Sequence, residues 1–216
     1  MRVLLLSAFL AITPLLAQAQ NGSSWQEGVH YHLIDQASAP SGDEIVVEEV
    51  FSYACPHCNS FQPFVGQWHA NLPEDVEFKR IPAIFSRSWE PFARAYLTLD
   101  AMGMIEQGHQ PLFDALHKEH KRLRTIEDIA GFLATQGIDE QQFLSTAQSF
   151  AVNGRINQVQ TQTRRYGISG TPSLVVDGKY RIAAGGPLNS YNDMLEVADY
   201  LVAQQRQARQ QLAASE

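Results

Sequence analysis

The sequence predicts an α/β domain that is interrupted by an all-helical insertion. Strand signals occur in two separate regions, one over residues 44–81 and the other over residues 172–182. Between them, a block of roughly seventy residues shows only helical periodicity. Strands on both sides of a helical block favour one α/β domain into which the helices are inserted.

The first strand signals surround the two cysteines. Residues His30–Ile34 alternate weakly and predict an edge strand, followed by a turn at residues 40–42. The run Glu44–Tyr53 is rich in Val, Ile and aromatic residues, which predicts a buried central strand that ends at the cysteines. A helix follows with Pro56 in its first turn, and Val76–Ile81 predicts the next strand. The apolar stripe of that helix consists of Phe61, Phe64, Val65 and Trp68.

Helical patterns fill the middle of the chain. The first predicted helix has Ser88 as its N-cap, ends near Gly103, and carries an apolar stripe that includes Trp89 and Phe92. Four more helical segments follow: Leu112–His117, Ile126–Thr135 with Thr125 as its N-cap and Gly137 at its end, a segment capped by Asp139, and one that runs to about Arg165.

The second strand region is "PSLVVDGKYRI", residues 172–182. Asp177-Gly178 divides it into two short strands, and this dipeptide is typical of a type I′ hairpin. A closing helix is predicted from its apolar face, which consists of Tyr191, Met194, Leu195, Ala198, Leu201 and Val202.

Residues 1–19 have the pattern of a cleaved signal peptide. Arg2 precedes an apolar run, Val3–Leu16, and Ala17-Gln18-Ala19 matches the small-x-small cleavage pattern. The apolar run is shorter than the roughly 20 residues that a membrane span needs. Residues 20–28 are predicted to form a flexible arm. Export would place the mature protein in the periplasm, where disulfides form and persist.

Composition excludes some classes of function. The chain has 216 residues, 44% hydrophobic and 18% charged, with a formal net charge of −7, so it offers no basic surface for nucleic acid. Its two cysteines, Cys55 and Cys58, are too few for a disulfide scaffold. The loop between them is also too short to restrain the unfolded chain. The pair is therefore predicted to serve a chemical role.

The sequence "CPHC" places Cys55 at the start of the predicted helix. The unpaired amides there favour a thiolate over a thiol, and His57 can add a hydrogen bond or a positive charge. Cys58 lies nearly one turn deeper, close enough to attack Cys55. A stabilised thiolate is a good leaving group, so the intervening Pro56-His57 favours an oxidising disulfide.

Metal binding is the alternative from a different class. A metal-binding or delivery protein could use Cys55, Cys58 and His57, because metal sites also use the C-x-x-C pattern. A zinc site would need two more ligands, and His117 and His120 are expected on a solvated helix surface instead. Haem attachment of the c type needs His directly after the second cysteine, where this chain has Asn59. No metal site is predicted.

The stretch "GISGTPSLVV" holds a proline at the start of a strand. Pro172 is compatible with a simple strand boundary. The functional interpretation is that Thr171-Pro172 faces the cysteine pair. The proline would offer no N–H there, and a cis bond would turn the flanking backbone toward a bound peptide.

Together, the export signal, "EVFSYACPHC", the helical block and "GTPSLVVDGKY" resemble the DsbA family of bacterial thiol:disulfide oxidoreductases, over about residues 28–200. Cys-Pro-His-Cys is the most typical active-site tetrapeptide of that family. The resemblance implies a thioredoxin-like fold formed by residues 29–83 and 153–216, with a helical insertion domain over residues 84–152. It also implies a cis Pro172.

The resemblance further implies the redox group, the substrates and the re-oxidising partner of the chain. A redox-active disulfide between Cys55 and Cys58 would be the only redox group, with no other cofactor. Newly exported cysteine-containing proteins would receive the disulfide, and a membrane quinone-linked DsbB-like partner would restore it. The chain is expected to act as a monomer.

In DsbA-like proteins a buried carboxylate lies beneath the active site. Glu49, six residues before Cys55, matches that position, and Arg80 on the next strand would be its basic partner, with Lys79 as the neighbouring alternative. The competing interpretation is that Glu48 or Glu49 faces solvent, as alternation along a strand requires.

One position departs from the best-known DsbA proteins, which carry Val where this chain has Thr171. Its hydroxyl could hydrogen-bond to the Cys55 sulfur, so a reductase or isomerase with a narrower client range remains an alternative on the same fold. Substrate peptides would use an apolar groove beside Cys55 and Pro172. The candidate lining aromatics are Tyr53, Phe61 and Trp89, although a place in the core is the favoured interpretation for each of them.

Overall fold

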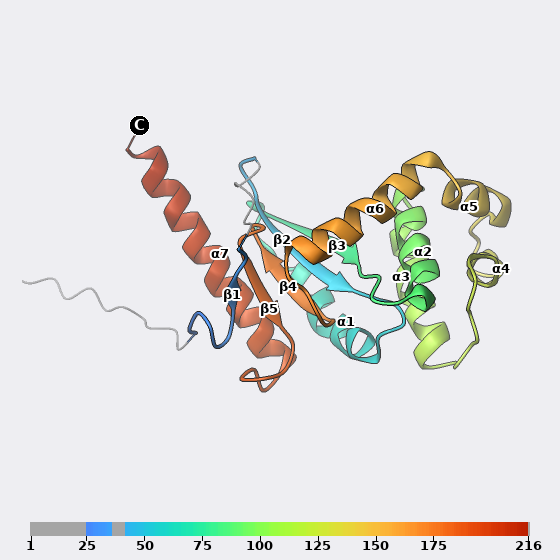
Figure 1. Cartoon of the computed structure of the whole chain (residues 1–216), viewed down its shortest axis with the longest axis horizontal. Helices are drawn as coiled ribbons and strands as arrows, with labels where there is room; N and C mark the ends of the chain where they lie inside the picture. The colour runs from blue at the N-terminus through green and yellow to red at the C-terminus, as the bar shows by residue number, and fades with distance from the viewer. Residues whose placement is uncertain (1–24, 36–41, 216) are drawn as a thin grey trace, which may run out of the picture.

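The computed structural model describes residues 25–35 and 42–215. Within these ranges five strands form one mixed sheet in the order β1-β5-β4-β2-β3 (Figure 1). Strands β2 and β3 are parallel, and the other neighbours are antiparallel. The strands are β1 (His32–Leu33), β2 (Ile45–Phe51), β3 (Val76–Pro82), β4 (Ser173–Val176) and β5 (Tyr180–Ala183).

Strand β2 lies inside the sheet and is buried on both faces, as its high content of Val, Ile and Phe predicts, although it also carries two glutamates. One face packs against α1 (Pro56–His69) and α7 (Tyr191–Ala213), where Val47 on β2 joins a core with Phe61 and Leu201. The opposite face packs against the helical segment, where Val50 joins a second core. The sheet thus lies between two helical layers, which is the α/β architecture that the sequence predicts.

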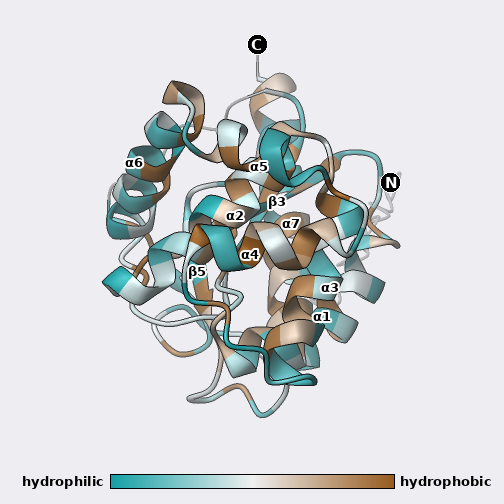
Figure 2. Cartoon of the chain, turned by 90° about the vertical axis from the view of Figure 1, so that its right-hand side faces the viewer, coloured by the Kyte–Doolittle hydropathy of each residue, from teal (hydrophilic) through white to brown (hydrophobic). Residues whose placement is uncertain are grey.

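The helical segment follows β3 and occupies the right-hand side of Figure 1. Viewed from that side, its helices show hydrophobic and hydrophilic strips side by side, as amphipathic helices packed around a core do (Figure 2). The helices are α2 (Glu90–Ala101), α3 (Ile105–His117), α4 (Ile126–Ala134), α5 (Glu140–Ala147) and α6 (Phe150–Arg165). The boundary expected between residues 152 and 153 falls inside α6.

Two helix starts differ from the prediction. Ser88 is not the N-cap of α2, because a short 3-10 helix over Arg87–Trp89 continues directly into α2. Helix α3 begins at Ile105 and not at Leu112. Gly108 and Pro111 weaken the local helix signal there. Tertiary packing leaves little room at this glycine, because a Cβ at Gly108 would lie 2.7 Å from the Leu99 side chain, which would have to shift.

Several local signals are confirmed. Thr125 and Asp139 cap α4 and α5 through their side chains. The β4–β5 turn has positive φ at both Asp177 (56°) and Gly178 (61°), as a type I′ hairpin requires. Ser149, which the sequence analysis did not identify, caps α6 by accepting a hydrogen bond from the backbone N–H of Val152.

Two arginine–aspartate pairs attach the end of α7 to the sheet. Arg206 makes a bidentate pair with Asp75, at 2.6 and 2.9 Å, in which both side chains remain partly exposed. A single nitrogen of Arg209, Nη2, contacts both carboxylate oxygens of Asp177, at 2.8 and 3.0 Å, and the Asp177 side chain is only 3% exposed. The second pair therefore holds a buried charge and the first does not.

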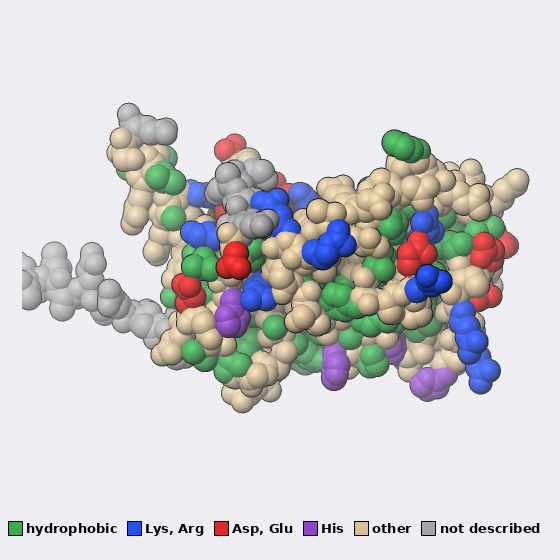
Figure 3. All heavy atoms as spheres, in the orientation of Figure 1, with side chains coloured by type: hydrophobic (Ala, Val, Ile, Leu, Met, Phe, Trp, Pro, Cys, Tyr) green, Lys and Arg blue, Asp and Glu red, His purple; other side chains and the backbone are tan. Residues whose placement is uncertain are grey.

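The predicted signal peptide, residues 20–24 of the predicted arm and residues 40–41 of the predicted turn lie outside the described residues. Residues 25–28 of that arm are described, and Trp25 packs against the core beside α7. No helix within the described ranges combines the length and apolar character needed to cross a membrane. On the face seen in Figure 3, basic side chains lie interspersed with acidic ones.

Candidate active site

The cysteine pair lies where β2 turns into α1. Cys55 is the N-cap of α1, with extended backbone dihedrals of −91° and 115°, and Pro56 occupies the first turn. Both cysteines carry free thiols. The Cys58 side chain is completely buried, and Cys55 is 6% exposed. The geometry therefore places one sulfur at the helix terminus near the surface and the second sulfur behind it.

The two sulfurs have opposite preferences for the proton. The pKa of Cys55 is lowered to about 5, chiefly by the hydrogen bond from the Cys58 thiol. The Thr171 side chain and the backbone amides of Cys58 and His57 lower it further, while burial opposes them. The pKa of Cys58 is raised, first by burial and then by the same contact with Cys55. At neutral pH the reduced pair thus carries a thiolate at Cys55 and a thiol at Cys58.

The peptide bond between Thr171 and Pro172 is cis, as the family resemblance implies, and Thr171 lies against the cysteine pair. The thiol of Cys55 donates a hydrogen bond to the backbone carbonyl of Thr171, with an Sγ–O distance of 3.4 Å. That contact favours the protonated sulfur, whereas the hydrogen bond from the Thr171 side chain favours the thiolate. The lowered pKa shows that the groups favouring the thiolate prevail.

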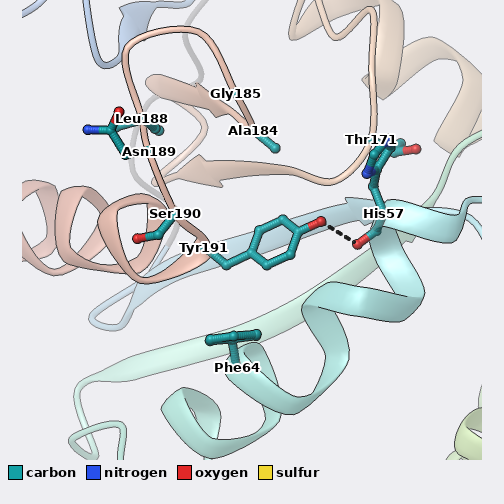
Figure 4. A pocket seen from close by; sticks show the side chains of 9 residues that line it. All are labelled: His57, Phe64, Thr171, Ala184, Gly185, Leu188, Asn189, Ser190 and Tyr191. Atoms are coloured by element: carbon teal, nitrogen blue, oxygen red, sulfur yellow. Dashed lines mark hydrogen bonds between the residues drawn. The ribbon is translucent and has the colours of Figure 1, made fainter.

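His57 contributes to the site through its backbone. Its N–H is among the donors that lower the pKa of Cys55. Its carbonyl accepts a hydrogen bond of 3.1 Å from the Tyr191 hydroxyl (Figure 4). This bond fixes the first turn of α1 to the start of α7.

A pocket of about 530 Å³ adjoins His57 and Thr171 (Figure 4). Its walls include Phe64 from α1, Leu188 from the loop after β5, and Tyr191 from α7. Phe64 and Tyr191 were assigned to the apolar stripes of their helices, and Leu188 was not identified. The stripe pattern could not show that their rings, whose centroids lie 5.6 Å apart, would wall an open pocket.

The three candidate lining aromatics do not line this pocket, and the favoured interpretation, a place in the core, is confirmed for Tyr53 and Phe61. Tyr53 and Phe61 belong to the buried core, with 1% and 0% exposure. Trp89 is partly buried and stacks on Phe85, with ring centroids 5.5 Å apart.

Glu49 is completely buried beneath the cysteines. Its carboxylate accepts hydrogen bonds from Arg80 Nε at 2.9 Å and from Gln62 Nε2 at 3.1 Å. Lys79, the alternative partner, instead pairs with Glu77 at the surface. Burial raises the pKa of Glu49, and the Arg80 charge only partly offsets that effect.

The expectation that Glu48 or Glu49 faces solvent is wrong. Glu48 is only 7% exposed, because α6 covers that face of the sheet. Its carboxylate accepts hydrogen bonds from the Tyr166 hydroxyl at 2.7 Å and from Gln162 at 2.8 Å. Alternation places the two glutamates on opposite faces of β2, and both faces are buried.

His117 was also misassigned as part of a solvated surface. Its Nε2–H donates to the backbone carbonyl of Tyr53 at 2.7 Å, two residues before Cys55. The donor role follows because a carbonyl oxygen can only accept. Within the described residues, no group of three or more His, Cys, Asp or Glu side chains lies together as a metal site would need.

Comparison with known proteins agrees with this geometry. The family model for the DSBA-like thioredoxin domain matches residues 67–196. The thiol:disulfide interchange protein DsbA of Pseudomonas aeruginosa is 40% identical, over 96% of this chain and 99% of its own length. The protein of the same name from Azotobacter vinelandii is 41% identical, over 97% and 100%. The chain belongs to the DsbA family.

Solved structures show the same fold. The crystal structure of Pseudomonas aeruginosa DsbA is 39% identical and covers 86% of this chain and 97% of its own, with a TM-score of 0.80. The oxidoreductase DsbA from Xylella fastidiosa is 31% identical over 82% and 95%, with a TM-score of 0.76. The resemblance found in the sequence is thus confirmed, and this DsbA-like chain is a thiol:disulfide oxidoreductase with a thioredoxin-like fold.

Proposed function

We propose that this chain forms disulfides in exported proteins by donating a Cys55–Cys58 disulfide. A substrate thiolate attacks the Cys55 sulfur, the Cys55–Cys58 bond breaks, and Cys58 leaves and takes up a proton. The substrate is then held through a mixed disulfide at Cys55. A second substrate thiolate attacks the substrate's own sulfur, so that Cys55 leaves as a thiolate. Two electrons pass from the substrate to the cysteine pair.

The opposite proton preferences of the two sulfurs carry this proposal. A pKa of about 5 makes Cys55 a good leaving group in the second step. The raised pKa of Cys58 lets it retain a proton inside the core after the first step. The stabilised thiolate of Cys55 favours the reduced pair, so the disulfide is a strong acceptor of electrons.

The substrate class follows from the pocket. Phe64, Leu188 and Tyr191 offer an apolar wall beside Thr171, which suits an apolar side chain next to a substrate cysteine. An extended segment of an unfolded protein presents such side chains, so we propose newly exported cysteine-containing proteins as substrates. We place the mature chain in the periplasm as a monomer without a further cofactor, re-oxidised by a quinone-linked DsbB-like membrane protein.

The equilibrium of the cysteine pair with glutathione tests the proposal. The mature chain is equilibrated over a range of ratios of reduced to oxidised glutathione, and its thiols are then trapped with a mass-adding alkylating reagent. We expect the pair to be reduced even where oxidised glutathione predominates. A pair that stays oxidised until reduced glutathione predominates would contradict disulfide donation. The Cys55→Ser variant should form no mixed disulfide at residue 55.

A reductase or isomerase is the second candidate, because this chain has Thr171 where the best-known DsbA proteins carry Val. The same glutathione series separates it from an oxidase. Refolding of a substrate with scrambled disulfides, followed against the glutathione background, would reveal isomerase activity. A metal-delivery protein that uses Cys55, Cys58 and His57 would instead show stoichiometric metal after mild purification without chelators.

A further inference from the structure

A buried chain of polar side chains runs from the sheet beneath the cysteines into the helical segment. Arg80 Nε donates to Glu49 at 2.9 Å, and Gln62 Nε2 donates to the same carboxylate at 3.1 Å. The other end of the Gln62 amide contacts His109 Nε2 at 3.0 Å, and His109 Nδ1 contacts the Tyr53 hydroxyl at 2.8 Å. Apart from Arg80, every member is at most 8% exposed.

The chemistry of these groups gives the hydrogen bonds one direction. The phenol of Tyr53 stays protonated, because burial raises its pKa well above the ordinary value, and it donates to His109 Nδ1. Burial lowers the pKa of His109 to about 3, so the ring is neutral, and its single proton is on Nε2 because the facing Gln62 oxygen can only accept. That Nε2–H donates to Gln62 Oε1, which leaves the Gln62 amide nitrogen facing Glu49. Each donor in this chain of hydrogen bonds therefore points toward the Glu49 carboxylate, which accepts the last one.

The chain reaches the redox site through α1. Gln62 lies one turn after Cys58, and its amide nitrogen is also within 3.5 Å of the Cys58 carbonyl oxygen. The Glu49 charge acts on the Cys58 thiol directly. His109 is held in place by edge-on contacts with the rings of Phe51 and Phe113, with centroids 5.4 and 5.3 Å away. A residue of the helical segment therefore fixes the amide that contacts both Glu49 and the cysteine helix.

We propose that Gln62 and His109 are positioning residues that hold the Glu49 carboxylate ionised beside Cys58, and that they thereby set how the disulfide–dithiol equilibrium of the cysteine pair depends on pH. This inference rests on the proposed redox role of the pair. It assigns a function to two residues, on α1 and α3, that carry no recognisable motif.

The electrostatic surroundings define what a variant should change. The negative charges of Cys55 and Glu49 both raise the pKa of Cys58, so they surround the same sulfur. The thiolate of Cys55 exists only in the reduced protein, and we expect its charge to oppose ionisation of Glu49, because like charges disfavour each other. Reduction therefore favours proton uptake at Glu49, and the plot of the equilibrium constant against pH bends where Glu49 titrates. The titratable and charged groups around Glu49 are Arg80 from β3, Cys58 from α1, Tyr53 from the turn after β2, Tyr96 from α2 and His109 from α3, and Cys55, the N-cap of α1, acts on the same Cys58 sulfur.

The test measures the glutathione equilibrium of the full mature chain between pH 4 and 9. The variants are His109→Phe and Gln62→Met, each alone and combined with Glu49→Gln. Without an oriented amide the carboxylate loses a charge-assisted hydrogen bond, worth about a tenfold change in its proton affinity. We expect the bend to move up by about one pH unit in both single variants. With Glu49→Gln this bend should be absent, only the bend from titration of Cys55 near pH 5 should remain, and adding either substitution should then leave the curve unchanged.

A packing control accompanies the series. Phe113→Leu loosens the same aromatic cluster but removes no hydrogen bond, so its bend should stay at the wild-type pH. The inference is overturned if His109→Phe and Gln62→Met leave the bend in place, if Phe113→Leu moves it equally, or if either substitution has the same effect in the Glu49→Gln background. Failure of the proposed function is a separate result, because it appears in the wild-type equilibrium constant itself.

Discussion

Replacing Thr171 by Val tests how the site sets the reactivity of Cys55. The largest cause of the lowered pKa is the Cys58 thiol, and the Thr171 side chain is the next group that lowers it. Thr171→Val removes the hydroxyl and keeps the branched shape. The backbone carbonyl of Thr171, which accepts from the Cys55 thiol, is unchanged. The variant therefore isolates one hydrogen bond to the sulfur.

The expected magnitude follows from that bond. A hydrogen bond to a charged group contributes about 1.5–3 kcal/mol, and one pKa unit corresponds to about 1.4 kcal/mol. Because the Cys58 thiol makes the larger contribution, we take the lower limit, a rise of about one unit from the value of about 5. The reduced protein then loses about 1.4 kcal/mol of stabilisation at neutral pH. The potential of the pair should fall by about 30 mV, or tenfold in its equilibrium constant with glutathione.

The assay is the rate of alkylation of the reduced protein by iodoacetamide, measured from pH 3 to 9. The pH at half-maximal rate reports the pKa of Cys55, since only the thiolate reacts. Thr171→Ser is the matched control, because it keeps the hydroxyl, and its midpoint should remain near that of the wild type. Equal midpoints for the Val and Ser variants, or a lower midpoint for Val, would refute the role of the hydroxyl.

Unfolding in urea provides three further tests. The lowered pKa of Cys55 gives the reduced protein stability that is present above the ordinary thiol pKa of about 8.5 and lost as pH falls through about 5. The difference between reduced wild type and Cys55→Ser should therefore shrink by about 1–3 kcal/mol from pH 7 to pH 4. Arg80→Met should cost about 3 kcal/mol or more, because it leaves Glu49 buried without its cation, and adding Glu49→Leu should recover most of that loss. Arg209→Met, whose aspartate partner is buried, should cost about 1–3 kcal/mol. Arg206→Met, with an exposed partner, should cost under about 1 kcal/mol, and equal costs would contradict the burial argument.

The fold was predictable where local pattern and tertiary environment agree. The apolar run before Cys55 is a central strand, and the Asp177-Gly178 turn adopts the positive φ values that its residue types favour. Helix α3 was predicted too short because its glycine is selected by packing against Leu99, which lies on another helix. A local sequence pattern reflects helix propensity, and it does not show where packing against another helix leaves room only for a small residue.

The site was predictable where residues are near the cysteines in sequence or covered by the family resemblance. The cis bond before Pro172 and the pairing of Glu49 with Arg80 are of that kind. His109 and His117 were not found, because they reach the cysteine loop from a helix about fifty residues away. Helical spacing shows that such a side chain shares a helix face with its neighbours, but it does not show which other part of the fold will pack against that face.

The direction of the chemistry follows from groups that act on only one redox state. The hydrogen bond from the Cys58 thiol to the Cys55 thiolate, the amides at the start of α1 and the Thr171 hydroxyl all stabilise a charge that the disulfide does not carry. Each of them therefore favours the reduced pair and makes the disulfide more oxidising. On this argument the departure from Val at Thr171 strengthens an oxidase and does not redirect it toward reduction, because a reductase needs a reduced state that is less stable.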